Sequence, residues 1–316
     1  MMISGLGDRC LTAMTTAGSP ATTIGEYHRI YRQFVSFLTE QQQATDDLRH
    51  FTEDHGRAFM AYLGGLGVKP NTIRHKLSAL STLAKFGLRE RDGRGRPYLD
   101  TNPLLTFPWP KRQRTKKEFL HPEELRAFLA VARPVHEAVA RDLFVDTGLR
   151  VSELCRANLE DVVRLADGWV LYVIVKGEGR QDELVPVPIS SAVAEGLVEY
   201  LTKRPAPLTR GPKGRTPLLL NSHGARWTRY ALGMAIKRMG KAAGIDRIHV
   251  SPHKLRRTSN VIARYGGVDS HARSRLLNHT SPNTIRDYDA VVPGEMAKAR
   301  EQARTVGLRR YLGEGL

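Results

Sequence analysis

The chain has 316 residues, 41% of them apolar, and a formal net charge of +17, so its length favours two domains. The charge favours a polyanionic partner, nucleic acid ahead of an anionic membrane, while no apolar run reaches the ~18 residues of a membrane span. The two cysteines, Cys10 and Cys155, exclude a disulfide framework and favour a reducing cytoplasm.

The N-terminal part of the chain is predicted to be helical. Residues 1–21 are rich in Gly, Ser, Thr and Ala, which favours a flexible leader. Helices are expected near 22–42, 53–66 and 71–88, because apolar side chains recur there at helical spacing. Residues 22–110 together are therefore predicted to form a small helical domain.

A basic segment follows this domain after a proline-rich stretch. It covers residues 111–118 and can be interpreted in two ways, as a solvated flexible linker or as an extended strap across a phosphate backbone. Its basic residues are Lys111, Arg112, Arg114, Lys116 and Lys117.

The second domain, residues 119–292, is predicted to be mainly helical with a small antiparallel sheet. Pro122 and the two acids after it favour a helix start. Apolar β-type runs at 170–175 and 184–189 predict a hairpin, and a short third strand is expected at 218–220. Helical patterns predominate from residue 228 onward. The predicted fold class is thus mainly α with a small antiparallel β-sheet, in two domains.

Four segments of the second domain carry side chains suited to phosphoryl transfer. In the first, Gly148 permits a sharp turn, Arg150 follows near a helix N-terminus, and Glu153 lies on the same helical face. An arginine held by a carboxylate is a preorganised phosphate ligand, although an ordinary surface ion pair has the same spacing. The second segment contributes Lys176 in the hairpin turn, where most lysines are simply solvated.

The third and fourth segments contribute two histidines, an arginine and a tyrosine. A Ser-Pro pair favours a helix start that puts His253 and Arg256 on one face of the first turn. Cations there oppose the helix dipole, which favours an anion at this position. In the fourth segment, Tyr288 follows His279 by nine residues. Either of these two side chains alone would more often be structural.

The ordered set of segments resembles the sequence boxes of the tyrosine recombinase (phage integrase) family. These boxes are an arginine in T-G-x-R-x-S-E-L, a hairpin lysine, H-x-x-R, and L-G-H with a tyrosine nine residues on. The chain departs from them at Asn278, where Gly is common, and at Arg257, where many members have His. Asn tolerates a left-handed backbone, so the turn is expected to survive. Residues 22–110 are similar to the family's core-binding (SAM-like) domain.

The resemblance implies a site-specific DNA recombinase or integrase that cleaves and rejoins strands through a 3′-phosphotyrosyl intermediate. A free phenol has a pKa of about 10, so its attack at neutral pH needs helpers. The resemblance implies these roles: Tyr288 as nucleophile, Arg150 and Arg256 as ligands of the scissile phosphate, Lys176 as acid for the leaving 5′-oxygen, His253 as proton acceptor, His279 as hydrogen-bond donor to the phosphate, and Glu153 as support.

The resemblance also implies the partners. The two domains would clamp double-stranded DNA at short core sites, in a homotetramer on two duplexes, in the cytoplasm with the nucleoid. No metal, ATP, other cofactor or membrane is implied. Residues 293–316 form a tail that can be exchanged between protomers or fold on its own domain. On the first of these alternatives, deletion after about Val306 spares single-site cleavage and impairs strand exchange. Besides the basic linker residues, the DNA contacts are assigned to Arg74, Lys76 and Arg257.

Several alternatives stay open on the sequence alone. A type IB topoisomerase-like DNA relaxer would use the same chemistry, and a non-catalytic DNA-binding regulator would keep the same fold. The biological task is open between phage integration, mobile-element transfer, cassette movement and chromosome-dimer resolution. The delivery of Tyr288, in cis or in trans, is open as well.

Overall fold

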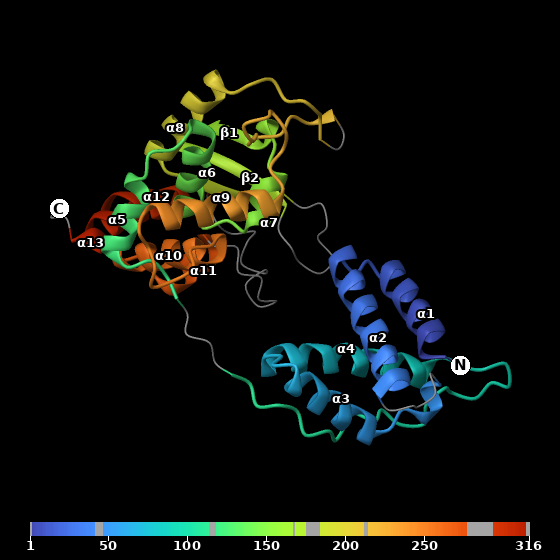
Figure 1. Cartoon of the computed structure of the whole chain (residues 1–316). Helices are drawn as coiled ribbons and strands as arrows, with labels where there is room; N and C mark the ends of the chain where they lie inside the picture. Colours follow the sequence, from blue (N-terminus) through green and yellow to red (C-terminus); the bar gives the residue numbers. More distant parts are fainter. Residues whose placement is uncertain are drawn as a thin grey trace. The chain divides into compact units, whose positions relative to one another are not determined.

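The computed structural model describes residues 2–41, 47–113, 118–166, 168–174, 184–211, 214–276 and 293–313. The chain divides into two compact units, Met1–Thr115 and Lys116–Leu316, which run from blue to teal and from green to red in Figure 1. In the described part of the chain, no helix has both the length and the apolar character needed to cross a membrane.

The first unit is a bundle of helices around an aromatic core. Phe34 and Phe59 lie at its centre, with their ring centroids 5.1 Å apart in an edge-to-face arrangement. The chain beyond the last helix stays with this core, because Leu104 and Phe107 are buried and approach Gly56. The elements are α1 (Ile3–Thr16), α2 (Ala21–Gln41), the 3-10 turn η1 (Leu48–His50), α3 (Glu53–Gly65) and α4 (Pro70–Arg89).

The prediction of a flexible leader over residues 1–21 is wrong. Residues Ile3–Thr16 form α1, which buries Ile3, Leu6 and Cys10 at helical spacing. The glycines of this segment lower its helix propensity, but they also allow a close approach. A Cβ at Gly7 would lie only 3.1 Å from the Tyr31 ring of α2. Packing against α2 and α4 therefore outweighs local propensity here.

The second unit is mainly helical around a three-stranded antiparallel sheet, which confirms the predicted fold class. Its helix α6 is buried over most of its length and packs against α8, α10 and β3. The helices are α5 (Pro122–Ala130), α6 (Val135–Thr147), α7 (Val151–Arg156), α8 (Ser191–Lys203), α9 (Arg229–Ala242), α10 (Pro252–Tyr265), α11 (Ser270–Leu276), α12 (Pro293–Gln302) and α13 (Leu308–Leu312), with a 3-10 turn η2 (Leu159–Asp161) and a π-helical turn η5 (Ala303–Gly307).

The sheet has the order β1 (Val162–Leu165), β2 (Gly168–Ile174) and β3 (Leu184–Ile189). The predicted hairpin is β2–β3, with Val173 opposite Val185, and residues 175–183 that join its strands lie outside the described residues. The third strand is β1, so its placement at 218–220 was wrong. Leu218 and Leu220 are fully buried, but their amides donate to the Ala157 carbonyl and to the Tyr200 hydroxyl.

The described part of the tail packs on its own unit. Tyr311 and Leu312 of α13 belong to the hydrophobic core of this unit, and the Tyr311 hydroxyl donates to the carbonyl of Leu120. Glycines allow a close contact between η5 and α10, because a Cβ at Gly307 would lie 2.3 Å from the Ile262 carbonyl oxygen. The tail thus follows the alternative in which it folds on its own domain.

Candidate active site

The site is built from the turn that connects α6 to α7. Helix α6 ends at Thr147, and Gly148 follows as its C-cap with a φ of 63°, in the left-handed region that favours glycine. Leu149 is then buried, which anchors the turn in the core. Arg150 follows as the N-cap residue of α7. The sequence T-G-L-R therefore fixes where this arginine leaves the backbone.

Glu153 holds both the main chain and the side chain of Arg150. Its Oε2 accepts a hydrogen bond from the Arg150 amide at 2.7 Å, and its Oε1 accepts one from Nη1 of the guanidinium at 2.7 Å. The Glu153 side chain is fully buried, whereas the Arg150 side chain is 30% exposed. A buried carboxylate with two such donors is well compensated. The predicted ion pair thus fixes the orientation of an arginine that still reaches solvent.

Arg256 reaches the same turn from α10. Its side chain is buried, and Nη1 donates to the Gly148 carbonyl oxygen at 2.8 Å. Burial, and after it the nearby charge of Arg150, lower the pKa of Arg256 to about 10, while the charge of Glu153 opposes the shift. Arg256 is still a cation at neutral pH. Two guanidinium groups from different helices are therefore held close together at one turn.

His253 lies on the first turn of α10, one helical turn before Arg256, and its side chain is exposed. The pKa of His253 is lowered by partial burial and then by the charges of Arg257, Arg256 and Arg150. Like charges that gather at one place repel one another, so an anion bound among them is favoured. The same charges keep the imidazole neutral at neutral pH, in the form that can accept a proton.

Three of the predicted catalytic residues lie outside the described residues, namely Lys176, His279 and Tyr288. The structure brings together the other three predicted catalytic residues and the supporting glutamate, which are Arg150, His253, Arg256 and Glu153.

The residues predicted to contact DNA have different surroundings. In the first unit, the Arg74 guanidinium donates to the Pro110 carbonyl at 2.6 Å and lies over the Trp109 ring, and Lys76 donates to the Gln33 side chain. Of the linker residues, Lys111 and Arg112 are exposed, while Arg114, Lys116 and Lys117 lie outside the described residues. In the second unit, Arg257 is half-buried beside His253.

Sequence reasoning missed Arg300, which is 2% exposed and donates to the main-chain carbonyls of Asp146 and Thr147 at the end of α6. It also missed Ser259 of α10, whose hydroxyl donates to the Asp146 carbonyl at 3.2 Å. Arg300 lies in a helix of mostly polar sequence, where no local pattern marks a buried arginine. Only the long-range packing of the tail reveals it.

The chain is similar to known recombinases over most of its length. Residues 118–294 match the sequence profile described as the phage integrase family. The chain is 30% identical over 288 residues to tyrosine recombinase XerC of Staphylococcus haemolyticus, covering 88% of this chain and 89% of that protein. It is 29% identical over 272 residues to tyrosine recombinase XerD of Caulobacter vibrioides, covering 84% and 85%.

Two solved structures share the fold. A lambda integrase dimer bound to a COC′ core site matches with a TM-score of 0.68 at 19% identity, over 93% of this chain and 100% of that chain. The XerH recombinase in a post-cleavage complex with a palindromic difH substrate matches with a TM-score of 0.69 at 20% identity, over 94% and 83%. The profile match covers the turn of Arg150 and the α10 segment, and the relatives extend over most of the chain. The chain therefore belongs to the phage integrase family and is a site-specific tyrosine recombinase.

Proposed function

We propose that this recombinase cuts double-stranded DNA by attack of the Tyr288 hydroxyl oxygen on the scissile phosphorus. The new bond joins phosphorus to the phenol oxygen, the bond to the 5′-oxygen breaks, and a 5′-hydroxyl leaves with a proton. The 3′-phosphotyrosyl link conserves the phosphodiester bond energy, so attack by another 5′-hydroxyl rejoins the strand. The observation that supports this proposal is the pair of arginines at the α6–α7 turn.

The two arginines suit the charge that develops on the non-bridging oxygens. Arg150 is oriented by Glu153 and Arg256 by the Gly148 carbonyl, so neither has to be reorganised when the phosphate binds. The lowered pKa of His253 supports its assignment as the group that accepts the phenol proton. The assignments of Lys176 to the leaving oxygen and of His279 to a phosphate oxygen are carried by the sequence.

The larger assembly is proposed on the same basis. The helical unit from α1 to residue 110 would serve as the core-binding domain, 111–118 as a strap along the phosphates, and 119–292 as the catalytic domain. One solved relative of the fold, at 19% identity, is a lambda integrase tetramer bound to a Holliday junction, and we propose a homotetramer on two duplexes for this chain. Tail exchange within it would require release of the contacts of Tyr311. DNA as substrate would place the enzyme in the cytoplasm with the nucleoid.

A covalent-capture experiment tests the proposed chemistry. The full chain is incubated with fragmented genomic DNA of its host, denatured and washed, and the DNA that stays covalently bound is sequenced. A duplex with that sequence, nicked beside the cleavage site so that the short product diffuses away, then traps the intermediate. We expect one DNA 3′-phosphate on the peptide that contains Tyr288, and no adduct with Tyr288→Phe. An adduct on another residue, or none with the unsubstituted chain, would overturn the proposal.

A further inference from the structure

The C-terminal end of α6 presents consecutive carbonyl groups to arginine side chains. The last carbonyls of a helix lack intrahelical donors and carry the negative end of the dipole, so cations are favoured there. Gly148 gives its carbonyl to Arg256 of α10. The two carbonyls before it, those of Asp146 and Thr147, accept hydrogen bonds from Arg300 of α12, the second at 3.2 Å. Two buried arginines therefore bind one short stretch of backbone.

Arg300 makes a third contact, on the other side of the site. Its Nη2 donates to the Leu276 carbonyl at 3.2 Å, and Leu276 is the last residue of α11. Three residues later in the sequence comes His279. One guanidinium thus joins the turn that precedes Arg150 to the helix end that precedes His279.

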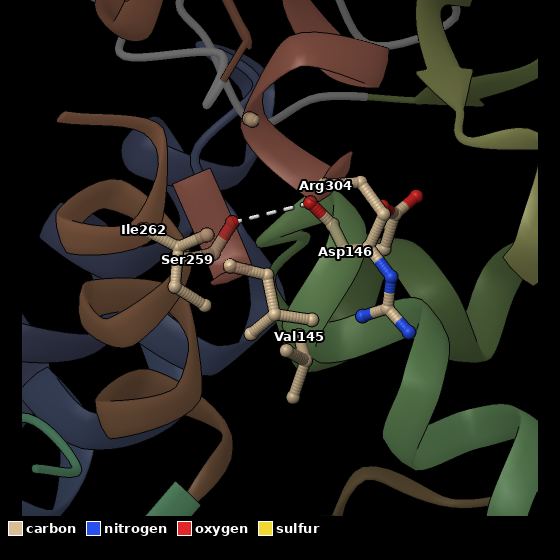
Figure 2. A pocket seen from close by; sticks show the side chains of 7 residues that line it. Val145, Asp146, Ser259, Ile262 and Arg304 are labelled. Atoms are coloured by element: carbon tan, nitrogen blue, oxygen red, sulfur yellow. Dashed lines mark hydrogen bonds between the residues drawn. The ribbon is translucent and has the colours of Figure 1, made fainter. Parts of the chain in front are cut away.

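The surroundings of Asp146 make this junction rigid. Figure 2 shows Asp146 between Ser259 of α10, whose hydroxyl donates to the Asp146 carbonyl, and Arg304 of the tail. The Asp146 carboxylate in turn accepts the Ser190 amide at the start of α8, at 3.0 Å. Burial lowers the pKa of Arg300, and the charge of Asp146 opposes the shift. A buried guanidinium with three main-chain carbonyl acceptors is held in a narrow range of geometries.

We infer that Arg300 is a positioning residue, which fixes the Arg150 turn and the end of α11 relative to each other. The inference rests on the function proposed above for Arg150, Arg256 and His279. Arg300 is buried, so it acts through the backbone that these residues share and not through contact with DNA. Its loss should therefore slow strand cleavage at saturating DNA and leave DNA affinity nearly unchanged.

The test compares Arg300→Met with a matched control, Arg141→Met. Arg141 of α6 is also buried and also donates to a main-chain carbonyl, that of Val131 at 3.1 Å, but away from the Arg150 turn. Methionine keeps much of the side-chain volume without a charge, which limits the structural disturbance. Melting temperature, DNA dissociation constant and single-turnover cleavage rate at saturating DNA are measured for the full chain and both variants.

We expect Arg300→Met to cleave about ten to a hundred times more slowly, because small displacements of catalytic groups have effects of this size. Its dissociation constant should stay within about threefold, since the phosphate contacts that govern affinity are untouched. Arg141→Met should lose a similar amount of thermal stability with little change in cleavage. Arg300→Lys keeps the charge but has only one nitrogen for three carbonyls, so we expect an intermediate rate.

DNA with an uncharged scissile linkage distinguishes a positioning role of Arg300 from a general loss of protein stability. A scissile phosphate with a methyl group in place of one non-bridging oxygen has less charge for the two arginines to neutralise. The deficit of Arg300→Met relative to the unsubstituted chain should therefore shrink on this DNA, whereas a deficit caused by misfolding should not. An unchanged deficit, or equal slowing by Arg141→Met, overturns the inference. The proposed function fails separately, if the unsubstituted chain forms no adduct at Tyr288.

Discussion

Arg256 of α10 donates from Nη1 to the carbonyl oxygen of Gly148 at 2.8 Å, and this glycine lies two residues before Arg150. The position of one arginine that we propose to bind the phosphate therefore depends on the same backbone turn that carries the other. Because Gly148 has a φ of 63°, the turn tolerates few other residues. The spacing of the two arginines is thus set by a single local conformation, rather than by two independent helices.

Glu153→Ala should uncouple Arg150 from this turn. The substitution removes the acceptor of both the Arg150 amide and the guanidinium. By analogy with the loss of one oxyanion donor, we expect single-turnover cleavage at saturating DNA to slow on the order of a hundredfold. The measurement is a quench-flow assay on the nicked duplex that traps the covalent product.

A second buried glutamate of the same unit provides the control. Glu137 of α6 accepts from Arg238 at 2.9 Å, and Glu137→Ala should lower the melting temperature without slowing cleavage by more than about threefold. Normal cleavage by Glu153→Ala, or a comparable loss in both variants, would contradict the assignment of Glu153 as the support of Arg150.

The pKa of His253 should be measurably low in the protein without DNA. Partial burial, and after it the charges of Arg257, Arg256 and Arg150, disfavour the charged form of this imidazole, so its titration midpoint should lie below the ordinary value of about 6.5. The side chain is then mostly neutral at pH 7, and it becomes charged only as the pH falls. Two-dimensional NMR of ¹⁵N-labelled imidazoles, assigned with His253→Gln, gives the midpoint directly.

Two perturbations should raise this pKa. Arg257→Gln removes the charge with the largest effect of the three, and a phosphate anion bound among the arginines favours the imidazolium. A titration midpoint of His253 at or above 6.5 in the free protein, or one that does not respond to Arg257→Gln, would show that the arginine charges do not act on His253.

The sequence predicted what is local, and the structure added what is distant in the chain. The helix periods around Phe34 and the β2–β3 hairpin follow from neighbouring residues, as does the pairing of Arg150 with Glu153. Helix α1 was not predicted because its glycines lower the helix propensity. The reason for Gly7 is its close approach to the Tyr31 ring, which the sequence does not reveal. Arg300 was missed because its acceptor at Asp146 lies 154 residues away, and no periodicity encodes a contact over that separation.

The tail should be required for the stability of the catalytic unit. The Tyr311 side chain is buried, its hydroxyl donates to the Leu120 carbonyl, and its ring packs edge-to-face against Tyr265. We expect Tyr311→Ala to lower the free energy of unfolding by about 3–5 kcal/mol, and Tyr311→Phe by about 1 kcal/mol. Urea titration followed by circular dichroism measures both.

Deletion after Val306 should then impair single-site cleavage as well as strand exchange, because it removes Tyr311 and Leu312 from the core. This outcome differs from the one expected for a tail that serves only a neighbouring protomer. A truncated chain that keeps its melting temperature and cleaves at the full rate, but no longer exchanges strands, would instead support such a tail.

The salt dependence of DNA binding should distinguish exposed linker cations from those with an internal role. The start of the linker is attached to α4, because the Asn71 side chain accepts from the Gln113 amide at 3.1 Å and donates to the Gln113 carbonyl at 2.8 Å. Lys111 and Arg112 are exposed beside this anchor. A cation that contacts a phosphate contributes about 0.9 to the slope of log K against log salt concentration. We therefore expect Arg112→Gln to reduce the slope by about one unit.

Arg74→Gln serves as the control for the change in slope expected with Arg112→Gln. The Arg74 guanidinium is half-buried, bonded to the Pro110 carbonyl and placed over the Trp109 ring, so its charge is engaged within the first unit. Its substitution should change the slope by less than about 0.3 while lowering the melting temperature, because the segment before the linker loses its attachment. Fluorescence anisotropy from 50 to 300 mM salt, over which the Debye length falls from about 14 to about 6 Å, gives both slopes. Equal slope losses for Arg74→Gln and Arg112→Gln would mean that Arg74 leaves its internal partners to contact the DNA.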